Sequence, residues 1–179
     1  MAFLEFLVIE IVTHFTRDID FSMEKAKRLS RKNDLFYFSP EGMFWKINRE
    51  RALLLGGPRA LLMQIANPLV AEAVAQHSSL KYDPVGRLNR TLDLMLTTIF
   101  GTKSQALQAA KTVNLTHSKV FGVLSEEIGP YKIRTEYSAS NPELMIWVWT
   151  TLVDTAILCY EKFIRPLKEF EKQKYYAEG

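Results

Sequence analysis

Cysteine and histidine are scarce in this 179-residue chain, and their scarcity excludes several kinds of site. A single cysteine, Cys159, excludes a disulfide framework within one chain and any metal or iron–sulfur site built from cysteine alone. Three histidines (His14, His77 and His117) leave little material for a multi-histidine metal site. The paired Glu-x-x-His segments of a helical di-iron bundle are absent, as are the HExxH, P-loop, GxSxG and GxGxxG motifs.

Charge of one sign is not in excess either. The chain has 23 basic and 20 acidic residues, a formal net charge of +3, so nucleic acid is not an expected partner. Apolar residues make up 47% and charged residues 24%, which is typical of a soluble globular protein rather than a disordered or fibrous one. The length suits one domain.

A secretory leader is not indicated at the N-terminus. Residues 3–15 are apolar but include Glu5 and Glu10, and they lack a basic region before them and a small-residue cleavage site after them. We interpret them as an amphipathic packing helix and expect a cytoplasmic protein. Binding of residues 1–15 to a membrane surface is the less favoured alternative.

Proline and glycine occur where helices would begin and end. Ser39-Pro40-Glu41, Asp83-Pro84 and Asn141-Pro142-Glu143 each combine a capping side chain with a proline at the first helical position. Gly56-Gly57-Pro58 and Asn67-Pro68 interrupt the pattern and allow new helices to start. The expected helices span about 40–54, 58–66, 68–77, 85–100, 103–122, 141–164 and 167–178.

We find no strand alternation and no hairpin signal, and we expect a loop over residues 123–140. The sequence therefore predicts an all-α fold. An N-terminal helical extension covers residues 1–34, and a single multi-helix domain covers residues 35–179.

The expected helix at 141–164 is apolar on every face, which is typical of a buried central helix. It is long enough to cross a membrane, but Asp154, Glu161 and Lys162 within it make that costly. Because a lone buried carboxylate is unfavourable, Asp154 should pair with a cation or a histidine, or be protonated. A structural ion pair is the simpler interpretation.

His117 falls on an apolar stripe of the expected helix 103–122. His117 should therefore face the core. The other members of the stripe are Ala106, Ala110, Val113, Val120 and Leu124. Two interpretations stay open. It is either a core histidine bonded to a neighbour, or a neutral imidazole ligand of the kind that holds haem iron.

Three polar residues follow the start of the helix at 85–100. Thr91 lies beside the stripe formed by Leu88, Leu92, Met95 and Ile99, with Arg87 near its edge and Arg90 further round. Arginine suits carboxylates such as haem propionates. Alternatively, these arginines are solvated or pair with a local acid such as Asp83.

Five segments occur in a recognisable order. They are LLLGGPRALLMQIANPLVAEAVAQHS, DPVGRLNRTLDLMLTTIFG, THSKVFG, YSASNPELMIWVWTTLVDTAI and YEKFIRPL. Together they resemble the domain shared by fungal MpaB-type oxygenases and bacterial rubber oxygenases (latex-clearing proteins). The resemblance covers roughly residues 35–178, and it implies an all-α fold.

The resemblance implies a haem-dependent oxygenase that uses dioxygen on an apolar, unsaturated substrate of the prenyl type. His117 matches the proximal ligand of haem b, and Arg87 and Thr91 match an arginine and a threonine near the haem. Arg90 falls where rubber oxygenases can present a distal lysine, but arginine is a very poor iron ligand, so we assign Arg90 to the propionates instead. Asp154 matches the acid of a recurring TLVD motif and would orient a polar partner. His77 matches the histidine of a recurring HS motif.

Departures from the family pattern support an alternative. Asn67 and Trp149 stand where many relatives have histidine, and typical relatives continue with further helices after the position of Gly179. We therefore expect a C-terminally short domain. The alternative function is that of a non-catalytic relative which binds a hydrophobic ligand or a partner chain, with homodimerisation as one way to cover the apolar helix. Glu72 is the conceivable base, although a solvated helical glutamate is the simpler interpretation.

Overall fold

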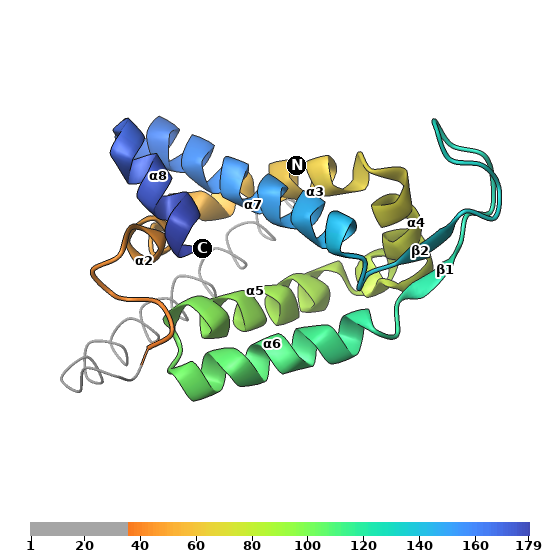
Figure 1. The fold of residues 1–179 in the computed structure, drawn as a ribbon, viewed down its shortest axis with the longest axis horizontal. Helices are drawn as coiled ribbons and strands as arrows, with labels where there is room; N and C mark the ends of the chain where they lie inside the picture. The colour runs from red at the N-terminus through yellow and green to blue at the C-terminus, as the bar shows by residue number, and fades with distance from the viewer. Residues whose placement is uncertain (1–35) are drawn as a thin grey trace, which may run out of the picture.

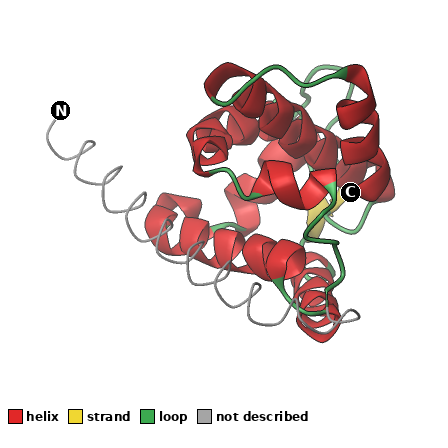
Figure 2. Cartoon of the chain, turned by 90° about the vertical axis from the view of Figure 1, so that its left-hand side faces the viewer, coloured by secondary structure: helices red, strands yellow, loops and turns green. Residues whose placement is uncertain are grey.

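The computed structural model describes residues 36–179, and helices account for most of this part of the chain (Figures 1 and 2). The predicted all-α class is confirmed. The expected extension at 1–34, with the helix at 3–15, lies outside the described residues. In chain order the elements are α2 (Met43–Asn48), the 3₁₀ helix η1 (Arg51–Gly56), α3 (Gly57–Ile65), α4 (Pro68–His77), the 3₁₀ turn η2 (Ser79–Lys81), α5 (Pro84–Phe100), α6 (Lys103–His117), β1 (Phe121–Val123), β2 (Glu136–Ser138), α7 (Pro142–Phe163) and α8 (Glu169–Glu178).

Local capping explains why four helices begin where they do. The side chains of Asn67, Asp83 and Asn141 accept hydrogen bonds from backbone N–H groups in the first turns of α4, α5 and α7. Thr102 and Gln105 form a reciprocal capping box at the start of α6. The three Asx-Pro starts predicted from the sequence are therefore confirmed.

The prediction of the first helix is wrong, because this helix starts later than expected and is not continuous. Instead of one helix over about 40–54, the chain forms the short α2 and then η1. Ser39 does not cap α2. The backbone N–H of Phe44 instead donates to the carboxylate of Glu178, at 2.8 Å, so the cap comes from the far end of the chain.

The predicted helix at 103–122 is too long, and the predicted loop at 123–140 contains a strand. The α6 helix ends at His117, and β1 then pairs antiparallel with β2, with Gly122 opposite Tyr137. Gly122 has a physical reason to be glycine, because a Cβ there would lie 2.6 Å from the Tyr137 hydroxyl. Strands of three residues are too short to show an alternating pattern in the sequence.

Two apolar clusters form the core. The larger one joins α2, the C-terminal end of α5, the second half of α7 and α8, and includes Ile47, Phe100, Tyr160 and Tyr175. The smaller one joins α4, the β-hairpin and the start of α7 through Leu69, Leu124, Tyr137 and Leu144. The α7 helix contributes to both clusters and is the central element of the fold (Figure 1).

The α7 helix is less enclosed than its composition suggests. Within the described residues it is the one helix long and apolar enough to cross a membrane, with mean hydropathy 1.3 over a window of which 44% is buried. Ile146 is 63% exposed and Trp149 is 41% exposed, so the prediction of neighbours on every face is wrong for the first half of α7. The second half, from Thr151 to Tyr160, is buried at most positions.

Candidate functional site

The α5–α6 hairpin brings two of the predicted site residues to the same end of the fold. Gly101 and Thr102 join the two helices, which run antiparallel and side by side (Figure 1). Arg87 lies in the first turn of α5 and His117 is the last residue of α6. Both therefore lie at the open end of this hairpin.

His117 is half-buried, as the apolar stripe predicted. Its Nδ1 atom is buried and has no hydrogen-bond partner, and no bond to its other ring nitrogen is formed within residues 36–179. Burial lowers the pKa of His117 below its ordinary value, so the ring is neutral at pH 7. The interpretation as a core histidine bonded to a neighbour is wrong, and the ring is free to act as a ligand.

The stripe itself is shifted from the predicted one. Ala106 is buried as expected, but Ala110 is exposed and Ala109 is buried in its place. The helix ends at His117, so Val120 follows it in a turn. The stripe on α5 is confirmed, because Leu88, Leu92 and Met95 are half-buried and Ile99 is buried.

Arg87 is a half-buried cation with no counter-charge among residues 36–179. Its side chain makes no hydrogen bond or ion pair with any described residue, and burial lowers the pKa of its guanidinium. The backbone carbonyl of Arg87 accepts a hydrogen bond from the Thr91 hydroxyl at 2.9 Å. The proton of Thr91 is therefore directed to its own helix, and the oxygen can offer a lone pair elsewhere.

Arg90 has partners close to it in the chain. Its guanidinium donates to Asp83, at 3.0 Å, and to the hydroxyl of Ser79, also at 3.0 Å. The bond from Arg90, together with the N–H of Gly86, holds the pKa of Asp83 below its ordinary value. The local-acid interpretation of these arginines is confirmed for Arg90, whereas Arg87 has no such partner.

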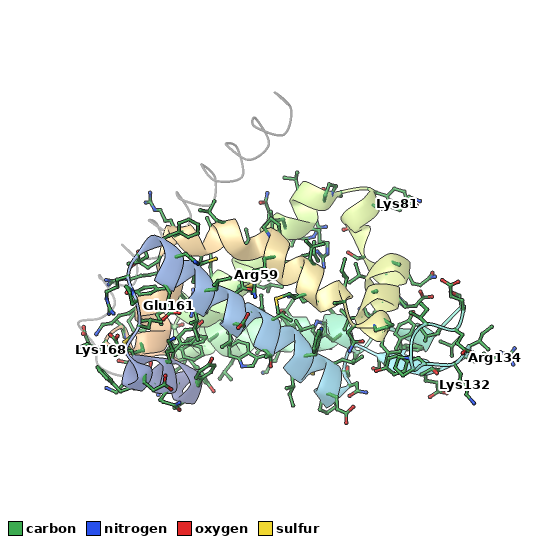
Figure 3. All side chains as sticks on the ribbon, turned by 90° about the horizontal axis from the view of Figure 1, so that it is seen from above. Arg59, Lys81, Lys132, Arg134, Glu161 and Lys168 are labelled. Atoms are coloured by element: carbon green, nitrogen blue, oxygen red, sulfur yellow. The ribbon has the colours of Figure 1, made fainter. Side chains whose placement is uncertain are left out.

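Asp154 forms an ion pair, as we predicted because an isolated buried carboxylate is unfavourable. Its carboxylate is, however, not buried. Its Oδ2 accepts from Arg59 of α3 at 2.8 Å, and the Asp154 side chain keeps 54% of its exposure. Arg59 also donates to the buried hydroxyl of Thr155 at 2.6 Å. Figure 3 shows Arg59 between α3 and α7. The partner of Asp154 lies on α3, so Asp154 is not joined to the α5–α6 hairpin by a bond.

Asn67 and Trp149, where the sequence resemblance implied histidine in many relatives, have capping and packing roles here. Asn67 caps α4, and the ring of Trp149 lies 5.9 Å from that of Phe44. Glu72 is half-buried and accepts from Gln76 and from Ser125. Both bonds are exposed to solvent, and a role of Glu72 as a base stays a prediction.

Sequence reasoning missed the residues that meet His77. The Nε2 of His77 lies 3.2 Å from the hydroxyl of Tyr137 on β2, and His77 lines an open groove together with residues from the end of α6. Tyr137 could not have been found from the sequence, because the β-hairpin that places it was itself not predicted.

Comparison with protein families agrees with this architecture. Residues 45–179 match the family model described as the catalytic domain of ER-bound oxygenase mpaB/B' and rubber oxygenase. The chain belongs to this family. The resemblance seen in the sequence is thereby confirmed, and the family is one of oxygenases. Searches among curated proteins and among solved structures returned no significant match.

Proposed function

We propose that this chain is a haem-dependent oxygenase in which His117 holds the iron and the substrate is an apolar, unsaturated molecule of the prenyl type. The observation that carries the proposal is the half-buried imidazole of His117, whose buried Nδ1 atom has no hydrogen-bond partner. A buried polar atom without a partner costs about 1–3 kcal/mol of free energy, and coordination through Nδ1 would recover it. Membership of an oxygenase family supports the reaction class.

The protein ligands available favour haem over a bare metal ion. Among residues 36–179, no group of three or more His, Cys, Asp or Glu side chains lies close enough to hold a metal ion. A porphyrin supplies four ligands itself and needs one axial group from the protein, which a neutral histidine supplies in many haem proteins. One unpartnered imidazole therefore fits haem b.

Arg87 fits the carboxylates that haem carries. A half-buried guanidinium that no described acidic residue neutralises is well suited to a bidentate pair with a propionate. Thr91 lies one turn along α5 from Arg87 and offers a hydroxyl oxygen. Arg90 and Asp154 already have protein partners, so we assign them to positioning α5 and α7.

The bound iron would supply activation of dioxygen. The residues of this chain would hold and orient the group, with His117 on the metal and Arg87 on the propionate side. The exposed apolar side chains of α7, among them Ile146 and Trp149, would suit an apolar substrate.

The same exposed side chains favour a second candidate function. Large apolar residues exposed together often mark a binding surface, so a non-catalytic relative that binds a hydrophobic ligand or a partner chain is the alternative. A second copy of the chain would be one such partner. The two candidates differ in whether the purified protein takes up haem.

A hemin titration monitored by UV–visible absorption tests the proposal. We expect a Soret band that survives gel filtration in the wild type and is lost in His117→Ala and in the bulkier His117→Gln. Asn114→Ala, which changes an exposed residue on the same helix, should retain the band. Far-UV circular dichroism and thermal unfolding would establish that each variant is folded. The proposal would be refuted if the wild-type protein did not bind hemin, or if a folded His117 variant kept an unchanged Soret band.

A further inference from the structure

An open groove of about 500 Å³ lies between the C-terminal end of α4 and the last turns of α6. It is lined by six residues, namely His77, Thr112, Leu115, Thr116, Lys119 and Val120. His117 is not among them, although it shares the last turn of α6 with Thr116. The groove is therefore distinct from the proposed haem ligand.

The groove has one positive side chain, that of Lys119, and no negative one. Two of its six residues carry basic nitrogen and none is a carboxylate. Lys119 is exposed and makes no ion pair with any residue of the described chain. The carboxylate of Glu72, on the same helix as His77, already accepts from Gln76 at 3.3 Å and from Ser125 at 3.2 Å.

Tyr137 orients the imidazole of His77. The two rings pack edge to face, with centroids 6.1 Å apart, and the hydroxyl lies 3.2 Å from Nε2. Tyr137 is buried, and burial together with the nearby Glu72 raises the pKa of its phenol, so the hydroxyl keeps its proton. When that hydroxyl donates to Nε2, the ring carries its own proton on Nδ1 and is a donor there.

The remaining lining is apolar in character. The hydroxyl of Thr112 donates to the carbonyl of Gln108 at 3.0 Å, and that of Thr116 donates to the carbonyl of Thr112 at 2.9 Å. These protons are not available to a ligand, so His77 and Lys119 are the side-chain donors of the groove. Leu115 and Val120 add aliphatic surface.

We propose that this groove binds the anionic end of an amphiphile, a carboxylate or a phosphate monoester attached to an aliphatic chain. The ammonium of Lys119 and the N–H of His77 would hold the anion, and Leu115 and Val120 would contact the first carbons of the chain. The proposal does not depend on haem, because none of the six lining residues is a proposed ligand of it.

Isothermal titration calorimetry with three probes of equal chain length tests this. Dodecyl phosphate and dodecanoate, each below its critical micelle concentration, should bind the full chain more tightly than dodecanol. Lys119→Gln should weaken the two anionic probes by roughly tenfold and leave dodecanol unchanged. The matched control is Lys111→Gln, which removes the same charge from an exposed position of α6 outside the groove.

A purely structural role for Lys119 predicts a different outcome. A cation near the C-terminal end of a helix stabilises that helix, and Lys119 lies two residues beyond the end of α6. If that were its whole role, Lys119→Gln would lower the melting temperature but would match Lys111→Gln in probe affinity. That result would overturn the proposal, as would equal binding of dodecanol and dodecyl phosphate by the wild type.

Discussion

Arg59 joins α3 to α7 by donating to two consecutive residues, to the carboxylate of Asp154 at 2.8 Å and to the hydroxyl of Thr155 at 2.6 Å. The carboxylate is half exposed, whereas Thr155 is buried. One guanidinium therefore makes a surface ion pair and a bond into the interior. Arg59 is the partner that the structure gives to Asp154, and a role of Asp154 at the proposed site stays a prediction.

The first prediction separates these two bonds. Asp154→Asn should lower the free energy of unfolding by about 0.5–1 kcal/mol, since exposed ion pairs contribute little. Arg59→Gln should cost about 1–2 kcal/mol more, because the buried hydroxyl of Thr155 loses its donor. Urea unfolding would measure both. Equal losses would show that the bond to Thr155 contributes nothing.

The second prediction concerns the two arginines of α5. Arg87→Gln should change the free energy of unfolding by less than about 0.5 kcal/mol, since no described residue bonds to its guanidinium. Arg90→Gln should cost about 0.5–1 kcal/mol, because it loses Asp83 and Ser79.

For hemin affinity we expect the opposite order, with Arg87→Gln having the larger effect. On the proposed function, Arg87→Gln should weaken hemin by roughly tenfold and Arg90→Gln should have a smaller effect. Titration monitored at the Soret band gives both values. An Arg87 variant that binds hemin as the wild type does would remove this residue from the proposed site.

Local chemistry explains which parts of the fold could be predicted from the sequence. Asn67, Asp83 and Asn141 cap the helices that they precede, and each bond spans only two or three residues. The apolar period of α5 likewise depends only on neighbours along the helix. Features of this kind depend on residues close together in the chain, so they can be predicted from the sequence.

Features set by distant contacts were missed. The end of α6 is set by the pairing of β1 with β2, and the start of α2 by Glu178. The core-facing position of His117 followed from its spacing, but its lack of a partner depends on the packing around it. The groove beside His77 depends on Tyr137 in the same way.

The third prediction concerns acid stability. Arg165 donates two hydrogen bonds to the carboxylate of Glu171, at 2.7 and 2.9 Å, and the N–H of Lys168 adds a third. These bonds lower the pKa of Glu171 to about 2 from its ordinary 4.5. The folded pKa lies below the unfolded one, so this stabilisation is present above about pH 4.5 and is lost as the pH falls towards 2.

Chemical unfolding between about pH 6 and about pH 2 would test it. Wild type should lose more stability over this range than Glu171→Gln, which cannot titrate there. Glu169→Gln is the matched control, because Glu169 lies on the same helix and, among the described residues, bonds only the side chain of Gln173. A wild type and a Glu171→Gln variant with parallel pH profiles would contradict the assignment.

The fourth prediction uses two adjacent glycines at the junction of η1 and α3. A Cβ on Gly56 would collide with the Cγ2 of Thr155 and lie 2.7 Å from the Sγ of Cys159, whereas a Cβ on Gly57 would meet nothing within 4 Å. Both residues have right-handed helical backbone angles, so alanine strains neither one conformationally. The two substitutions therefore differ in packing alone.

Gly56→Ala should lower the free energy of unfolding by about 1–3 kcal/mol, because α7 cannot approach η1 as closely. Gly57→Ala should raise it by about 0.4–1 kcal/mol, since alanine restricts the unfolded chain more than glycine does. Thermal unfolding of the two variants in parallel gives the sign of each change. Equal effects of alanine at both glycines would contradict this prediction. They would show that the close packing of η1 against Thr155 and Cys159 does not hold this end of α3 on α7.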